Sequence, residues 1–163
     1  MSNKKNHTEQ FDKIFKIVAP ELHIFIEDHY ETYIIMENVR NNSTVENCNI
    51  VLNRVGKEIK GHFQYEEQFI LPKLNNYIAE KEVGPLAKLI EDHRFIEDKY
   101  NYIVEQLEKN KFTTEIIDEI KKLAYLVKKH IEKEDHYLFP LISIILKPEE
   151  KQEIKAKLEE LKQ

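Results

Sequence analysis

The stretch HFQYEEQFILPKL, residues 62–74, is repeated in outline by HIEKEDHYLFPLI, residues 130–142. In both stretches a histidine is followed by glutamate four residues later, then by a second acidic residue, and by proline ten residues after the histidine. The tetrapeptide IEDH also occurs twice, ending at His29 and at His93. The order IEDH and then HxxxE therefore occurs twice, which indicates an internal repeat with one helical hairpin in each half.

The composition around this repeat favours long helices. The chain has 163 residues, of which only 3 are Gly and 5 are Pro, and 34% are charged. A chain of this length predicts one domain. Apolar residues recur at helical spacing in four long segments, separated by breaks near Asn41–Thr44, near residues 80–85 and near Lys109–Lys111. These features predict an all-α fold, an antiparallel four-helix bundle with a short extra C-terminal helix.

The expected organisation has three parts. Residues 1–10 are polar and are expected to be a flexible N-terminus. Residues 11–147 form the bundle, and residues 148–163 form a C-terminal helix packed on it. Pro72 and Pro140 are expected to kink or end their helices, because proline lacks a backbone N–H.

Charge and cysteine content exclude several classes of function. The net charge is −5, which argues against a nucleic-acid-binding protein. No apolar run approaches the length of a membrane span, so no membrane partner is expected. The single cysteine, Cys48, excludes a disulfide framework and suits a reducing compartment. The sequence therefore predicts a cytoplasmic protein.

Four histidines share a local pattern that predicts burial. Apolar residues stand three positions before them: Ile26, Ile59, Ile90 and Val127. Apolar or aromatic residues also stand seven positions after them: Met36, Phe69, Tyr100 and Tyr137. Residues at these spacings share a helix face, so the four histidines His29, His62, His93 and His130 are expected to face the core.

Two glutamates join them on the inward stripes. Glu66 and Glu134 each lie one turn beyond a histidine of the HxxxE pattern. Buried carboxylates are costly unless something pairs with them, and a pair of metal cations would do so. The predicted metal ligands are His29, His62, Glu66, His93, His130 and Glu134, with the two glutamates bridging two ions. Histidine and carboxylate from facing helices suit iron, with manganese or zinc less favoured.

With these residues the chain resembles hemerythrin-like proteins of the HHE cation-binding family, whose pattern is H…HxxxE…H…HxxxE. The resemblance covers roughly residues 20–146. It implies a four-helix bundle with two iron ions in a non-haem di-iron centre. Oxygen-carrying hemerythrins are similar but have His-x-x-x-His on the third helix, where this chain has His93 and Glu97. Glu97 is therefore either an additional ligand or a group outside the ligand set.

A second resemblance is to di-iron proteins that repair iron centres under stress. They are similar in placing a histidine six residues before the first ligand, as His23 stands before His29. They also carry a histidine near the end of the first helix, which the stretch NSTVENCN lacks, and often an N-terminal cysteine-containing segment.

Three functions follow as expectations. The first is binding, sensing or scavenging of oxygen or nitric oxide at the di-iron site, by a metal-binding protein rather than a classical enzyme. The second is an iron-centre repair or stress-protection factor with nitric oxide or peroxide chemistry. The third is a structural or partner-binding bundle whose site is vestigial or filled by zinc.

Overall fold

The computed structural model describes residues 2–79 and 84–163, and this part of the chain is helical without any β-strand. Its main α-helices are α1 (Ser2–Ile17), α2 (His23–Asn41), α3 (Val45–Lys57), α4 (Leu71–Asn75), α5 (Leu89–Lys109), α6 (Thr114–Lys133), α7 (Phe139–Ile145) and α8 (Pro148–Lys162). Short 3₁₀ turns, η1 (Pro20–Leu22) and η5 (Gly84–Lys88), precede α2 and α5. The break expected at residues 80–85 falls partly on residues 80–83, which lie outside the described ranges.

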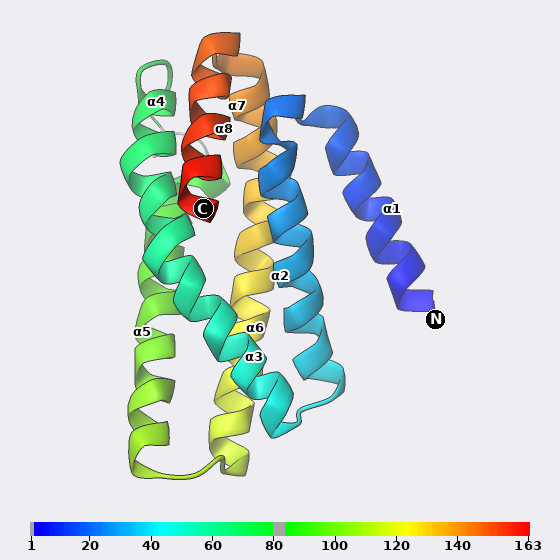
Figure 1. Cartoon of the computed structure of the whole chain (residues 1–163), viewed down its shortest axis with the longest axis vertical. Coiled ribbons are helices and arrows are strands. Elements are labelled where there is room, and N and C mark those ends of the chain that lie inside the picture. The colour runs from blue at the N-terminus through cyan, green and yellow to red at the C-terminus, as the bar shows by residue number, and fades with distance from the viewer. Residues whose placement is uncertain (1, 80–83) are drawn as a thin grey trace.

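The bundle consists of two hairpins. The helix α2 packs on α3 and α6, and α5 packs on α6, so the second hairpin closes the bundle against the first (Figure 1). Threonine side chains start the second helix of each hairpin. The Thr44 hydroxyl accepts from the Asn47 N–H at 3.1 Å, and the Thr113 hydroxyl accepts from the Ile116 N–H at 3.2 Å. Such caps satisfy amide groups that have no partner inside the helix. The all-α bundle predicted from the sequence is confirmed.

Both expected prolines lie just after a stretch of π-helix. The segments η2 (Glu58–Phe63) and η3 (Glu66–Ile70) join α3 to α4, and η6 (Glu134–Leu138) joins α6 to α7. In these wide turns the N–H of Leu71 reaches the Glu66 carbonyl, and the N–H of Phe139 reaches the Glu134 carbonyl. Proline cannot continue the ordinary ladder, because its ring clashes with the carbonyl four residues earlier. The π turns therefore allow each helix to continue through its proline.

The π turns also explain where the predicted stripes are wrong. Tyr137 is 50% exposed although it lies seven residues after His130, because the wider turn rotates the residues that follow Glu134 out of phase. Ile90 is 40% exposed, whereas Leu89 beside it at the start of α5 is buried, so the first turn of α5 faces the core with Leu89. Three of the other stripe positions, Ile26, Met36 and Val127, are buried as expected, and the remaining three, Ile59, Phe69 and Tyr100, are half-buried.

Two apolar clusters enclose the middle of the bundle. One contains Phe25, Tyr65 and Phe139, and it extends to the inner face of α8 through Ile154 and Leu158. The other contains Phe63, Ile96, Leu123 and Val127 between α3, α5 and α6. The buried ligand residues lie between these clusters: the rings of His29 and His62 contact Phe139 and Phe25 of the first, and those of His93 and His130 contact Phe63 of the second. They therefore form a polar layer between two apolar ones.

The segments outside the bundle are helical. The helix α1 lies along α2 and begins at Ser2, within the segment predicted to be flexible, and Phe11 packs edge-on against Tyr30 and Tyr33. The helix α8 lies beside α4 and α7 in Figure 1, where the Tyr65 hydroxyl donates to the Ile154 carbonyl at 2.6 Å. The division into 1–10, 11–147 and 148–163 stays a prediction. In the described part of the chain, no helix is long and apolar enough to cross a membrane.

Candidate metal centre

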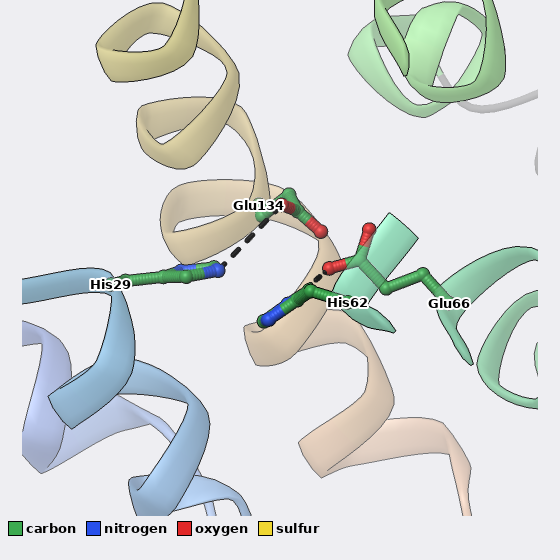
Figure 2. A group of neighbouring side chains, drawn as sticks. All are labelled: His29, His62, Glu66 and Glu134. Atoms are coloured by element: carbon green, nitrogen blue, oxygen red, sulfur yellow. Dashed lines mark ion pairs between the residues drawn. The ribbon is translucent and has the colours of Figure 1, made fainter. Parts of the chain in front are cut away.

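The six predicted ligands meet at the centre of the bundle. His29 comes from α2, His62 and Glu66 from the π-helical connection after α3, His93 from α5, and His130 and Glu134 from the end of α6. Five of them are at most 3% exposed, and the side chain of His62 is 8% exposed. Figure 2 shows His29, His62, Glu66 and Glu134 pointing toward one another from three separate segments.

Their ligand atoms fall into two groups that share one residue. His29, His62, Glu66 and Glu134 form one group, and Glu66, His93 and His130 form the other. Within each group the atoms that could ligate lie within 4.8 Å of one another. The two halves of the sequence repeat thus meet at the centre, because each group combines side chains of both halves.

Each glutamate contacts one histidine of each half. Glu66 lies 2.6 Å from His62 Nε2 and 3.0 Å from His93 Nε2. Glu134 lies 2.9 Å from His130 Nε2 and 3.7 Å from His29 Nε2. A carboxylate between two imidazole nitrogens has the placement that a bridging ligand requires.

Several of these buried atoms have no hydrogen-bond partner among the described residues. They are His62 Nε2, both carboxylate oxygens of Glu66, Glu134 Oε2 and His130 Nδ1. The 2.6 Å approach of His62 Nε2 to Glu66 Oε1 lacks the angles of a hydrogen bond, so the two atoms converge without forming one. Unpaired buried polar groups cost on the order of 1–3 kcal/mol each. A cation in the layer would satisfy these atoms together.

A second carboxylate lies behind each histidine. Asp135 accepts from His29 Nδ1 at 2.6 Å, and Glu67 accepts from His93 Nδ1 at 2.8 Å. These acids directly follow Glu134 and Glu66, so each acid pair sends its first member into the centre and its second to a histidine of the other half. Glu67 and Asp135 therefore support the histidine rings from behind.

Two further supporting acids were missed in the sequence. Glu58 lies 3.3 Å from His62 Nδ1, and Asp92 lies 3.5 Å from His130 Nδ1. The first could have been found, since it stands one turn before His62 on the same face. The second could not, because Asp92 and His130 meet only when α5 packs on α6.

These carboxylates shift the titration of the histidines. Burial opposes a positive charge on His62, but the carboxylates of Glu66 and Glu58 outweigh it and raise the pKa to about 10. Burial likewise disfavours a charge on His130, whereas Glu134 and Asp92 raise its pKa to about 10. Burial raises the pKa of Glu134, and the neighbouring Glu66 carboxylate adds to this effect. Against burial, His62 holds the pKa of Glu66 well below its usual range. Protons therefore compete with any cation for this site.

The remaining sequence candidates lie outside both groups. The Glu97 carboxylate accepts from Arg94 at 3.1 Å, and Arg94 also pairs with Glu67. Glu97 thus belongs to a surface network behind His93. The ring of His23 contacts the Val18 carbonyl at 2.9 Å. Neither contact brings a donor atom into the centre.

A comparison with protein families agrees with this geometry. The model of the hemerythrin HHE cation-binding domain matches residues 21–142, which is most of the chain and includes all six residues. The chain belongs to the hemerythrin HHE cation-binding family. Searches of curated proteins and of solved structures gave no match. The family and the His/Glu cluster together identify a metal-binding, hemerythrin-like protein.

Two cavities border the centre of this hemerythrin-like bundle, and each is lined by one of its histidines. One of about 320 Å³ is lined by His62 together with residues of α2, α3 and α8, among them Asp28 and Leu161. The other, of about 60 Å³, is lined by His130 and Asp92. The larger one makes the His62 side the more accessible, and its size admits small molecules.

Proposed function

We propose that this hemerythrin-like protein holds two iron ions and binds oxygen or nitric oxide at them. One ion would be held by His29 and His62 and the other by His93 and His130, with Glu66 and Glu134 shared. The observation that carries this proposal is the position of each glutamate between one histidine of each half. Imidazole and carboxylate donors suit iron, and manganese or zinc would be weaker candidates.

The iron pair would supply open coordination positions at which a small molecule binds. The chain's own residues do the rest. The two apolar clusters exclude water from the layer, and the outer acids Asp135, Glu67, Glu58 and Asp92 orient the imidazole rings from behind. The cavity beside His62 gives a small ligand a route to the centre.

The contacts favour binding or sensing over iron-centre repair. One of the features shared with repair proteins is His23, and this ring is engaged by the Val18 carbonyl away from both ligand groups. Outside the two ligand groups, no other cluster of three or more His, Cys, Asp or Glu side chains with metal-ligand spacing occurs in residues 2–79 and 84–163. Any turnover of peroxide or nitric oxide would therefore take place at the same centre.

The iron content of purified variants tests the ligand assignment. Protein produced with iron available should contain about two irons per chain, and Glu66→Ala and Glu134→Ala should each lose the pair, because each removes a ligand shared by both ions. Glu97→Ala is the matched control, since Glu97 pairs with Arg94 at the surface, and it should keep both irons. Retention of two irons by Glu66→Ala would contradict the bridging role.

Ligand binding is tested on the iron-loaded protein. Anaerobic titration of the reduced form with nitric oxide, or exposure to oxygen, should change the visible absorption spectrum in a saturable way. Saturable binding without consumption of the ligand supports a binding or sensing role. Continuous consumption of nitric oxide or peroxide would favour the stress-protection alternative. A spectrum unchanged by either gas, or zinc in place of iron, would favour a structural role.

A further inference from the structure

A cavity on one side of the bundle lies away from the metal centre. It has a volume of about 460 Å³ and is lined by residues of α2, α5 and α6, three helices that pack together in Figure 1. None of the six proposed ligands lines it. Its volume lies within the usual range for small-molecule sites. The cavity is therefore a site separate from the proposed iron pair.

Its floor and walls are apolar. Met36 and Ala124 are almost fully buried and form the base, with Leu126 beside them. Phe95 and Tyr125 are 58% and 52% exposed, so two large rings stand at the mouth with much of their surface in water. When an apolar group enters the cavity, it removes the surface of these rings from water, and this burial favours binding.

Its rim is strongly cationic. Among the described residues, five basic side chains and no carboxylate line the cavity; the basic residues are Arg40, Lys99, Lys121, Lys122 and Lys128. The whole chain carries a net charge of −5, so this surface has the opposite sign to the molecule. Such a rim draws anions towards the cavity.

Only part of this positive charge is neutralised. Glu119 forms ion pairs with both Lys99, at 2.5 Å, and Lys122, at 3.0 Å, and Glu37 pairs with Lys128. Within residues 2–79 and 84–163, Arg40 and Lys121 form no ion pair. Glu132 also acts on Lys128, so five cations face three carboxylates, and the two cations without an ion pair are free to receive an anionic group.

We propose that this cavity binds a small amphiphilic carboxylate, an aliphatic chain ending in one negative charge. Arg40 and Lys121 receive the carboxylate, and the chain lies over Met36 and Ala124 between the two exposed rings. The apolar floor disfavours a fully hydrated anion such as phosphate, because it offers no partners to replace the lost water. The cationic rim disfavours a neutral lipid. The inference does not depend on iron, since the two sites share no residue.

Calorimetric titration of the full chain with decanoate tests the proposal, with decanol as the neutral probe of equal length. Decanoate should bind with a dissociation constant below about 0.1 mM, and decanol at least about tenfold more weakly. The double variant Arg40→Gln, Lys121→Gln should weaken decanoate binding about tenfold or more. The double variant Lys16→Gln, Lys88→Gln removes the same charge from exposed positions outside the cavity and should bind like the parent.

A further variant tests the apolar contribution to binding separately from the contribution of the charge. Phe95→Ala shortens an exposed wall without disturbing the core, and it should weaken decanoate and decanol by the same factor. Equal affinity for decanol and decanoate, or equal loss in the two double variants, would overturn the proposal. So would a dimer, seen by light scattering, that decanoate dissociates, because the occupant would then be a second copy of the chain.

Discussion

At the scale of single residues, the centre depends on two layers of acids. The inner pair, Glu66 and Glu134, contacts the Nε2 atoms, and an outer acid faces the Nδ1 atom of each of the four central histidines. The twofold repeat is broken in the outer layer. Asp92 supports His130, whereas its counterpart Asp28 is tied to Lys162 of α8 at 2.5 Å and leaves His62 to Glu58.

The outer acids should set metal affinity without being ligands. Asp135→Asn keeps the size of the side chain but weakens acceptance from His29 Nδ1, so iron affinity should fall about 10–100-fold with the fold intact. Competition with a chromophoric chelator measures the affinity, and circular dichroism checks the fold. Glu132→Gln is the matched control, because Glu132 is a half-buried residue of α6 that pairs with Lys129 and touches no ligand histidine, and it should change neither. Unchanged affinity in Asp135→Asn would show that the Asp135 contact is structural.

Iron binding should depend strongly on pH. The metal-free protein holds protons on His62 and His130 up to a pKa of about 10, above the usual 6.5, and a metal needs the neutral imidazoles. Each added proton therefore competes with iron, and the apparent affinity should rise continuously as pH increases from about 6 to about 8. Anaerobic loading in weak buffer with a pH indicator should also show release of about two protons per chain. A pH-independent affinity would contradict these raised pKa values.

At the scale of elements, the π turns and the C-terminal helix position the centre. Both inner glutamates lie at the first residue of a π-helical segment, where the wide turn lets each acid pair face two directions. The helix α8 then covers the cavity at His62 with Leu158 and Leu161. It is held by the Tyr65–Ile154 hydrogen bond and by the ion pair between Lys73 and Glu153 at 2.5 Å.

The Tyr65 hydroxyl should contribute to the docking of α8. Tyr65→Phe leaves the buried Ile154 carbonyl without this donor and should lower the free energy of unfolding by about 1 kcal/mol. Urea unfolding followed by circular dichroism measures the change. Tyr102→Phe is the control, because Tyr102 is 52% exposed, and its effect should stay within about 0.5 kcal/mol. Equal effects of the two substitutions would contradict the role of this contact.

At the scale of the whole molecule, a polar layer divides the core in two. The buried carboxylates and imidazoles of that layer are poorly satisfied by one another, as the unpaired atoms show. A chain of 163 residues can form a core without metal, so the bundle should fold in the metal-free state. In that state the polar layer should lower the stability of the fold.

Iron should therefore stabilise the folded protein measurably. At a free metal concentration about 100 times the dissociation constant, the gain is about 2.7 kcal/mol. For a domain of this size that corresponds to an increase in Tm of roughly 5–10 °C. Calorimetric scans of metal-free and iron-loaded protein measure it, and Glu66→Ala should show no comparable increase. An equal Tm with and without iron would indicate that the layer holds no stabilising metal.

The sequence by itself predicted the all-α bundle and the residues that gather at its centre. Helical periodicity places His29, His93 and their counterparts on inward faces, and this property belongs to each helix alone. The repeat further predicted that each half of the chain supplies half of the metal ligands. These predictions depend on the spacing of residues along each helix, which can be read directly from the sequence.

Only the tertiary structure decided how the halves join. Which histidine lies behind which acid depends on the contact between helices, as in the pair of His29 and Asp135. The exposure of Tyr137 depends on a π turn that no spacing rule records, and the cationic cavity combines Arg40 and Lys121 from separate helices. Such features arise from packing between distant segments, whose relative rotation is fixed only when the bundle closes.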